Sequence, residues 1–131
     1  MSDFPECRPG RRSSVSMQVG EEDTALAMGS GDVPVLATPH VLALAERAAV
    51  QALGSCLPED RTSVGAWVEL EHLLPSRVGE TVTAEAVLLG VHGRRLEFSV
   101  SVRNGDDEEV AHLRHHRILV DRSRFQDAAR R

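Results

Sequence analysis

The segment Thr38-Pro-His-Val-Leu-Ala-Leu-Ala-Glu-Arg-Ala-Ala-Val-Gln-Ala-Leu53 decides how this chain folds. Threonine followed by proline is a strong start signal for a helix, with the Thr38 hydroxyl as N-cap and Pro39 at the first helical position. Gly54 and Pro58 follow the segment and predict its end. Positions three, four and seven apart share one face of a helix. The predicted apolar stripe consists of Leu42, Ala45, Ala49 and Leu53.

Glu46 is the one acidic residue in this stripe. A carboxylate among apolar neighbours is costly to desolvate, and its pKa rises as it loses water. Such a group usually has a paired partner or a chemical role. Two interpretations follow from the pattern. Glu46 is either a buried functional carboxylate or a residue that borders the core and reaches solvent.

After the helix the hydrophobic period changes to two, which predicts strands over residues 63–74, 81–91, 96–102 and 110–120. Turn signals at His92-Gly93 and Asn104-Gly105 join them as hairpins. Hairpins make an antiparallel sheet, and its apolar face and the apolar helix must cover each other. The sequence therefore predicts an α+β protein of the hot-dog fold, a curved antiparallel sheet wrapped around one long central helix.

The length of 131 residues supports a single domain, which we place at 17–131. Residues 1–16 contain Pro, Gly, Ser and Arg without periodicity, so a flexible leader is predicted there. Residues 21–28 are compatible with a short helical turn. A four-stranded sheet has open edges, and pairing them across a two-fold axis predicts a homodimer or a dimer of dimers.

Composition excludes several classes of function. The net charge of −5 argues against general nucleic-acid binding, and no apolar run is long enough to span a bilayer. All 15 basic side chains are arginine, which removes lysine-based Schiff bases and Walker-type phosphate loops. There is no apolar secretory signal at the N-terminus. Because Cys7 lies in the predicted leader, we expect no disulfide with Cys56 and predict a cytoplasmic protein.

Thr38 and His72 are candidate partners of Glu46. His72 shares a predicted strand face with Val68 and Leu70, where a lone histidine is more often a satisfied core residue than a catalyst. A carboxylate on the helix that covers this face would give the imidazole an acid–base partner. Thr38 is at a helix N-terminus, where a hydroxyl and free amides can stabilise an oxyanion.

Three histidines occupy the last predicted strand. His112 and His116 share one face while His115 faces the opposite way with Arg117, so they do not converge on one metal ion. We therefore predict no metal site. Arg94 and Arg95 flank the His92-Gly93 turn, where they can meet the phosphates of a ligand or simply be solvated.

From residue 35 to residue 125 the chain resembles the fluoroacetyl-CoA thioesterase family of hot-dog proteins. The resemblance rests on the following stretches: Val35-Leu-Ala-Thr38-Pro-His with Glu46, Thr62-Ser-Val-Gly65, the strand with His72, Val78-Gly-Glu-Thr-Val-Thr83-Ala, His92-Gly-Arg-Arg-Leu96, and His115-His-Arg117 with Phe125. It implies a catalytic triad of Thr38, Glu46 and His72.

The same resemblance assigns Gly65 to the place where the backbone approaches the acyl group, and Arg117 and His115 to the substrate site. The chain also departs from the family pattern. The family carries a phenylalanine lid before the helix, where this chain has Gly31-Asp-Val-Pro34, and His116 replaces an acidic residue. Selectivity for a fluorinated acyl group is therefore not predicted.

The sequence predicts hydrolysis of a small acyl-CoA or acyl-carrier-protein thioester. No cofactor is required, since coenzyme A is part of the substrate. Two alternatives remain at this stage. A hot-dog hydratase or dehydratase places an Asp and a His together before the helix, but Asp32 and His40 are eight residues apart here. A non-catalytic acyl-CoA-binding protein is the other.

Overall fold

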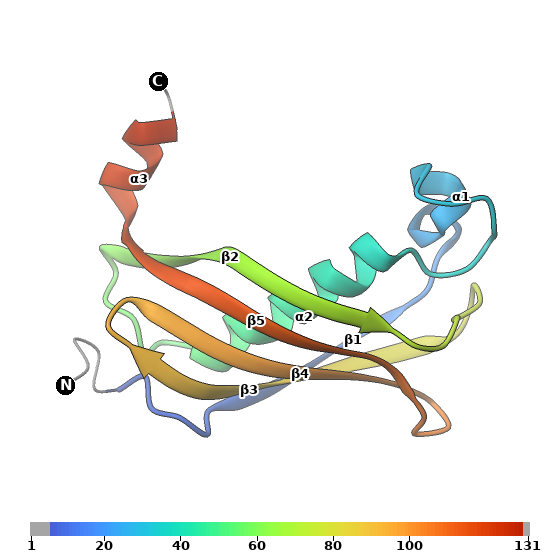
Figure 1. The fold of residues 1–131 in the computed structure, drawn as a ribbon, viewed down its shortest axis with the longest axis horizontal. Coiled ribbons are helices and arrows are strands. Elements are labelled where there is room, and N and C mark those ends of the chain that lie inside the picture. Colours follow the sequence, from blue (N-terminus) through green and yellow to red (C-terminus); the bar gives the residue numbers. More distant parts are fainter. Residues whose placement is uncertain (1–5, 130–131) are drawn as a thin grey trace.

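A computed structural model describes residues 6–129, in which five strands form one antiparallel sheet (Figure 1). The long helix α2 lies across one face of this sheet. The strand order is β1-β3-β4-β5-β2. The predicted α+β architecture is confirmed. The elements in chain order are β1 (Arg12–Gln18), the 3-10 helix η1 (Glu21–Asp23), α1 (Ala25–Met28), α2 (Thr38–Leu53), β2 (Arg61–His72), β3 (Thr81–His92), β4 (Arg95–Asn104), β5 (Glu109–Asp121) and α3 (Arg122–Ala129).

The core lies between α2 and the sheet. Successive side chains of a strand point to opposite faces, so alternate residues of β3 and β4 face the helix. These buried rows are Val82, Ala84, Ala86, Leu88, Leu96, Phe98, Val100 and Val102. Small alanines on α2 let the helix approach the sheet closely. The side of α2 that faces away from the sheet stays exposed, as Val50 shows. A single chain therefore does not enclose the helix on all sides, although the sequence predicted that it would.

The prediction of a flexible leader over residues 1–16 is wrong for residues 12–16, which belong to β1. β1 pairs with β3 along its whole length, from Arg12↔Val87 to Gln18↔Thr81. Val15 and Met17 pack against the core, and Val19 is buried within it. The folded domain therefore begins before residue 17. Residues 1–5 lie outside the described part of the chain.

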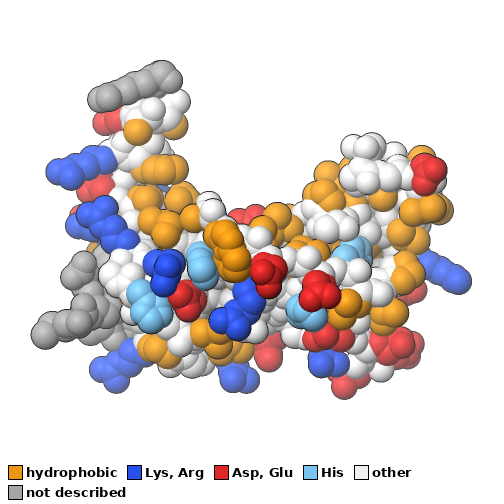
Figure 2. Space-filling view, in the orientation of Figure 1, with side chains coloured by type: hydrophobic (Ala, Val, Ile, Leu, Met, Phe, Trp, Pro, Cys, Tyr) orange, Lys and Arg blue, Asp and Glu red, His pale blue; other side chains and the backbone are white. Residues whose placement is uncertain are grey.

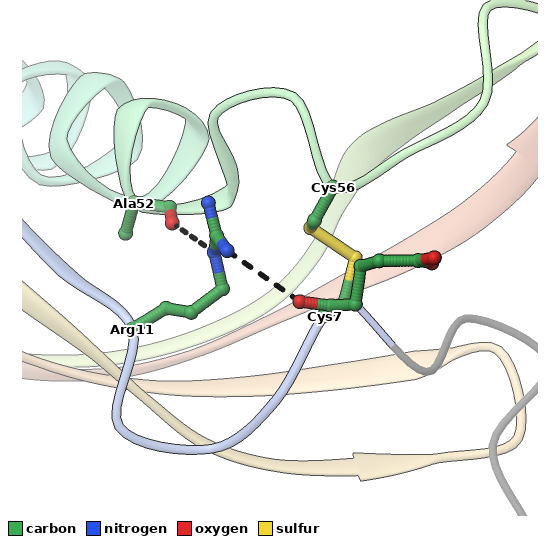
Figure 3. Close-up of a disulfide and its surroundings, with 5 residues drawn as sticks. Cys7, Arg11, Ala52 and Cys56 are labelled. Atoms are coloured by element: carbon green, nitrogen blue, oxygen red, sulfur yellow. Dashed lines mark hydrogen bonds between the residues drawn. A yellow bond between two sulfur atoms is a disulfide. The ribbon is translucent and has the colours of Figure 1, made fainter.

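Cys7 and Cys56 form a disulfide that joins the segment before β1 to the segment after α2 (Figure 3). Arg11 supports the same junction, because its Nε donates a hydrogen bond of 2.9 Å to the carbonyl oxygen of Ala52. Both cysteines are buried. The expectation that no disulfide would form is wrong, since it depended on placing Cys7 in a flexible leader.

Reducing this disulfide is expected to lower the melting temperature. The two cysteines are 49 residues apart, and the chain-entropy cost of closing a loop of that size corresponds to about 4 kcal/mol. For a domain of this length, that loss lowers Tm by roughly 10–15 °C. Calorimetry with and without dithiothreitol measures the change, and a Cys7→Ser/Cys56→Ser variant should not respond to the reductant. An unchanged Tm after verified reduction would contradict the prediction.

β2 is a free edge of the sheet, because within the described chain it pairs only with β5. α1 and α3 rise at the two ends of this edge, and the surface between them is hollowed (Figures 1 and 2). Trp67, Val68 and Leu73 are exposed by 45%, 37% and 46% along it. Apolar side chains on an open strand edge mark a surface suited to pairing with another chain.

α3 was not predicted, and none of its described side chains is buried. Its first turn is held by Asp121, whose Oδ1 accepts a hydrogen bond from the backbone N–H of Arg124 at 3.0 Å. Among residues 6–129, no helix has the length and apolar character needed to cross a membrane.

Candidate active site

Thr38 and His72 meet at the start of α2. The Oγ1 of Thr38 lies 2.8 Å from the Nδ1 of His72, a hydrogen bond between the helix and the end of β2. The sequence predicted Thr38 as the N-cap, but Ala37 occupies that position and makes no side-chain cap. The Thr38 hydroxyl is therefore not used to satisfy the helix and is directed to the imidazole instead.

Burial favours the neutral form of His72. It lowers the pKa of His72 below its ordinary value, and the nearby backbone of Leu74 opposes that effect only in part. The Nε2 of His72 is buried and has no hydrogen-bond partner among the described residues. An unpaired buried nitrogen is costly to retain, so it marks a place where a ligand or water can bind.

A cavity of about 370 Å³ opens beside this pair. The segment before α2, at residues 30–36, forms one wall of it. Gly31 and Val33 contribute to this wall and present no aromatic side chain. The full lining is Ala25, Ser30, Gly31, Val33, Val35, Leu36, Thr38, Pro39, His72, Leu73, Leu74 and Pro75.

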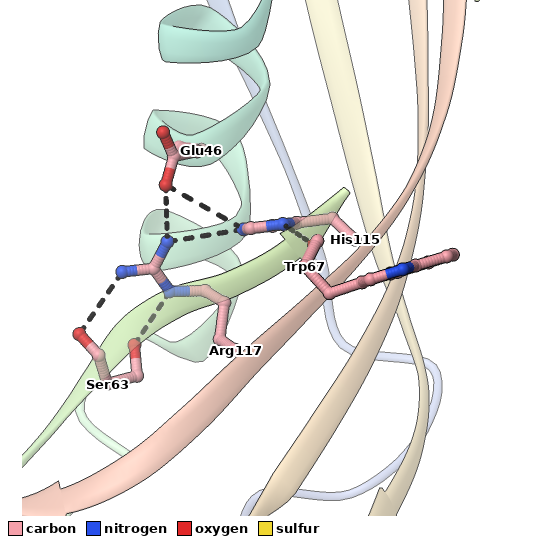
Figure 4. A network of polar contacts seen from close by, with 5 residues as sticks. All are labelled: Glu46, Ser63, Trp67, His115 and Arg117. Atoms are coloured by element: carbon pink, nitrogen blue, oxygen red, sulfur yellow. Dashed lines mark hydrogen bonds and ion pairs between the residues drawn. The ribbon is translucent and has the colours of Figure 1, made fainter. Parts of the chain in front are cut away.

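Glu46 belongs to a second group of polar side chains, centred on Arg117 (Figure 4). The Nη1 of Arg117 donates to the Oε2 of Glu46 at 3.2 Å. Its Nε donates to the Oγ of Ser63 at 2.8 Å, and its Nη2 donates to the Ser63 carbonyl at 3.1 Å. The side chain of Arg117 is only 8% exposed, whereas that of Glu46 is 37% exposed. Glu46 thus borders the core, and its charge balances a buried guanidinium.

The tautomer of His115 follows from its neighbours. Its Nδ1 lies 2.9 Å from the carbonyl oxygen of Trp67, which only accepts, so Nδ1 carries the proton. Its Nε2 accepts from the Nη1 of Arg117 at 3.3 Å and lies 4.0 Å from the Oε2 of Glu46. Burial, first, and the nearby guanidinium both lower the pKa of His115, while the Trp67 hydrogen bond and Glu46 oppose them.

Gly65 allows Glu46 to approach β2. A Cβ at this position would lie 2.5 Å from the Oε2 of Glu46, which would force the carboxylate to move, and 3.3 Å from the Cε1 of His115, a tight contact. A cavity of about 290 Å³ opens at this point. Its lining is Leu42, Glu46, Gly65, Ala66, Trp67, Val68 and His115.

Gly65→Ala is expected to displace the Glu46 carboxylate while the fold persists, because Gly65 is not among the residues with positive φ. The sequence predicts a catalytic role for Glu46, and a catalytic group moved by about 1 Å commonly loses on the order of a hundredfold in rate. Steady-state thioester hydrolysis and Tm measure the two effects. Gly105→Ala is the matched control, since a Cβ there meets nothing within 4 Å. Equal activities of the two variants would contradict the role of Gly65.

Within one chain the structure does not bring Glu46 to His72. Glu46 contacts β2 at Gly65, and His72 is seven residues farther along that strand. Seven residues of strand span roughly 20 Å. The single chain therefore joins Thr38 to His72 and, separately, Glu46 to Gly65, His115 and Arg117. Sequence reasoning missed Ser63, which shares a strand face with Gly65 and fixes Arg117.

The other candidates lie apart from both groups. Arg95 pairs with Glu97, with 3.0 Å between Nη2 and Oε1. Arg94 lines a cavity at the base of α3. The Nδ1 of His40 lies 3.6 Å from the Oδ1 of Asp23, so its acidic neighbour is Asp23 and not the Asp32 of the hydratase alternative. No three His, Cys, Asp or Glu side chains of residues 6–129 are placed to hold a metal ion.

A family model for fluoroacetyl-CoA-specific thioesterases matches residues 19–123. This chain belongs to that family. A fluoroacetyl-CoA thioesterase from Streptantibioticus cattleyicolor is 33% identical over 96 residues, which cover 73% of this chain and 68% of the relative. Membership in the family confirms the predicted resemblance and the prediction of a thioester hydrolase.

Solved structures agree with the family. A solved structure of the fluoroacetyl-CoA thioesterase FlK superposes with a TM-score of 0.86 at 29% identity, covering 94% of this chain and 95% of that one. A thioesterase superfamily member from Thermus thermophilus gives a TM-score of 0.88 at 22% identity, covering 95% and 91%. A hot-dog-like protein from Thermanaerovibrio acidaminovorans gives 0.87 at 24% identity, covering 97% and 94%. The predicted hot-dog fold is confirmed.

Proposed function

We propose that this protein hydrolyses the thioester of a small acyl-CoA, with Thr38, Glu46 and His72 as its catalytic residues. The observation that carries the proposal is the hydrogen bond between Thr38 and His72, whose free Nε2 lies in a buried position beside a cavity. Membership in a thioesterase family supports the reaction type. Without an aromatic side chain at Gly31-Asp-Val-Pro34, we do not propose selectivity for a fluorinated acyl group.

The roles follow from donors and acceptors. We assign the proton of neutral His72 to Nδ1, so that Nδ1–H donates to the Thr38 oxygen across their contact and leaves the Thr38 hydroxyl hydrogen free for the thioester carbonyl oxygen. Water attacks the carbonyl carbon and gives a proton to the Nε2 of His72. When the carbon–sulfur bond breaks, the imidazolium returns that proton to the leaving sulfur. The charge of Glu46 stabilises the imidazolium between these two steps.

This mechanism requires Glu46 near His72, and we propose that a two-fold dimer provides that proximity. If two β2 edges pair antiparallel about a centre between Val68 and Glu69, residue 65 of one strand lies opposite the partner subunit's His72. The exposed Trp67 and Val68 lie at the middle of that contact. Glu46 beside Gly65 then faces the partner subunit's His72 in a shared site. A further association of two such dimers is also proposed.

Two measurements test these proposals. Purified protein is assayed against a panel of short acyl-CoA and acyl-carrier-protein thioesters, and both free thiol release and enoyl-CoA hydration are followed. Thiol release supports a thioesterase, hydration alone favours the hydratase alternative, and tight binding without either favours a non-catalytic binding protein. Light scattering at micromolar concentration gives the assembly, and a fully active monomer would contradict the dimer.

The shared site is tested by mixing Glu46→Gln and His72→Ala chains after unfolding and refolding. A heterodimer then has one site with both native residues, so random mixing should restore about a quarter of the parental activity. If each site is made by a single chain, the mixture has no intact site and stays inactive.

The proposed mechanism predicts a specific dependence on pH. His72 must be neutral to accept a proton, and burial keeps its pKa below the ordinary value of 6.5. Therefore kcat/KM should decline toward acid pH with a midpoint below 6.5, provided that burial outweighs the opposing charge of Glu46 in the shared site. A pH profile of kcat/KM for the best acyl-CoA measures this. A decline with a midpoint above 6.5 would contradict neutral His72 as the proton acceptor.

The predicted cytoplasmic location remains a proposal. The Cys7–Cys56 disulfide argues against a cytoplasmic location, because disulfides persist mainly in oxidising compartments. Thiol trapping in freshly lysed cells, followed by mass measurement, reports the state of the two cysteines where the protein is made.

A further inference from the structure

The cavity beside Thr38 and His72 has more room than a two-carbon acyl group needs. Its volume is about 370 Å³. A methylene group occupies about as much space as a water molecule, roughly 30 Å³, so an acetyl group would fill about a sixth of the cavity and a six-carbon chain about half. An apolar ligand is held through the surface that a site removes from water. The volume therefore favours a chain longer than two carbons.

The wall between α1 and α2 is fixed by backbone hydrogen bonds, so the cavity keeps this volume. The N–H of Ala25 donates to the carbonyl of Val35 at 2.8 Å, and the N–H of Leu26 donates to the carbonyl of Val33 at 3.1 Å. Gly31 leaves space on the same wall, because a Cβ there would lie 3.2 Å from the Cβ of Ala25. Small residues in a braced segment thus hold the cavity open.

The lining of this cavity is mostly apolar. Leucine, valine, alanine and proline residues supply its walls together with Gly31, and its polar side chains are Ser30, Thr38 and His72. The last two contact each other and are the groups assigned to the reacting carbonyl. The rest of the cavity offers apolar contacts to the chain that continues from that carbonyl.

The cavity also lacks a partner for a negative charge. Among the described residues that line it there is no arginine, aspartate or glutamate, and its ionisable side chain, His72, is already engaged with Thr38. A carboxylate at the end of an acyl chain would be desolvated there without an ion pair, which is costly. Asp32, an exposed residue of the adjoining segment, would repel such a group.

We propose that this cavity binds an unsubstituted, apolar acyl chain of about six carbons and rejects chains that end in a carboxylate. The proposal rests on the proposed thioester hydrolysis and names the substrate class of the same site. Val33 is the specificity-determining residue, since it belongs to the braced wall and its side chain is 49% exposed, which leaves room for a larger one.

The first test compares straight saturated acyl-CoA substrates from acetyl to hexanoyl, with adipoyl-CoA as the six-carbon acid. Each buried methylene should raise kcat/KM about fourfold, so hexanoyl-CoA should exceed acetyl-CoA by on the order of a hundredfold. Adipoyl-CoA should fall below hexanoyl-CoA by on the order of a hundredfold, because its charge would be buried without a partner. Acetyl-CoA or adipoyl-CoA hydrolysed as well as hexanoyl-CoA would overturn the proposal.

The second test narrows the cavity. Val33→Phe should lower the ratio of kcat/KM for hexanoyl-CoA to that for acetyl-CoA about tenfold, because the ring excludes part of the longer chain. Val78→Phe is the matched control, since Val78 is 45% exposed and does not line the cavity. Ala25→Leu is a second narrowing variant whose side chain starts from a buried position, with Ala25 only 9% exposed. An unchanged ratio in both narrowing variants would overturn the proposal.

Binding of S-hexyl-CoA and S-ethyl-CoA, thioethers that cannot be hydrolysed, separates this proposal from the proposed function. By calorimetry the hexyl compound should bind about tenfold or more tightly than the ethyl compound, and Val33→Phe should weaken only the hexyl compound. If this holds and no thioester is hydrolysed, the function fails and the acyl site stands. If thioesters are hydrolysed and neither kcat/KM nor affinity depends on chain length, the acyl site is overturned and the function stands.

Discussion

Glu46→Gln is expected to slow thioester hydrolysis by on the order of a hundredfold or more while the assembly persists. The amide keeps the shape of the side chain and loses the charge that stabilises the protonated imidazole, and loss of an acid–base group usually costs this much. Turnover of the best acyl-CoA and light scattering measure the two results. Glu85→Gln, an exposed residue on β3, is the control.

The same substitution should also lower the free energy of unfolding, by about 1–2 kcal/mol. In the parent, Glu46 balances the charge of the nearly buried Arg117. The side-chain amide of glutamine can still accept the hydrogen bond from Arg117, but it cannot balance the charge. If Glu46 were an unpaired buried charge, the substitution would instead raise the free energy of unfolding. Denaturant unfolding at neutral pH distinguishes the two.

Combining Glu46→Gln with His72→Ala should cost much less than the product of the two single losses, because residues that act as a unit are not additive. Turnover of Glu46→Gln close to that of the parent would instead show that the carboxylate serves only Arg117. The catalytic assignment of both residues would then be wrong.

Removal of residues 1–18 is expected to leave a chain that does not fold stably. The deletion takes away β1, uncovers the edge of β3, and removes Val15 and Met17 from the side that packs on α2. It also removes one cysteine of the disulfide. Full burial of two such side chains would stabilise by roughly 3–6 kcal/mol, and these two are partly buried, so they contribute less. The lost disulfide, about 4 kcal/mol, and the lost β1–β3 pairing add to that, and the total approaches the whole stability of a typical domain.

Circular dichroism during heating measures this effect, and removal of residues 1–5 is the control because it leaves both β1 and Cys7 in place. A truncated chain without residues 1–18 that melts cooperatively near the parental temperature would contradict the importance of β1. It would also restore the original expectation of a dispensable leader.

The helix and four strands could be predicted because their patterns are long and regular. α2 ends at the predicted Leu53 and begins at Thr38, one residue before the predicted first helical position, and the rows of β3 and β4 alternate as expected. β1 was missed although Val15 and Met17 alternate with serines, because Arg, Ser and Gly around them resemble a linker. An edge strand half exposed to solvent gives only that weak signal.

The candidate site was predicted in part. The contact between Thr38 and His72 fits the predicted placement of His72 on the face that the helix covers. Strict alternation puts Gly65 on the face of Trp67, away from the helix. A bulge between these two residues turns Gly65 toward Glu46 instead. One extra residue in a strand moves the side chains that precede it to the opposite face of the sheet. The hydrophobic periodicity of the sequence does not reveal such a bulge.

Trp67 gives the protein a built-in optical probe at one place. It is the only tryptophan, and the chain has no tyrosine, so its near-ultraviolet emission is free of other strong contributions. The indole stacks on the imidazole of His116, with 4.4 Å between ring centres, and its backbone carbonyl holds His115. Its fluorescence therefore reports directly on the middle of β2: dissociation of paired edges, protonation of His116 and ligand entry beside Gly65 should each change its intensity or wavelength without any added label.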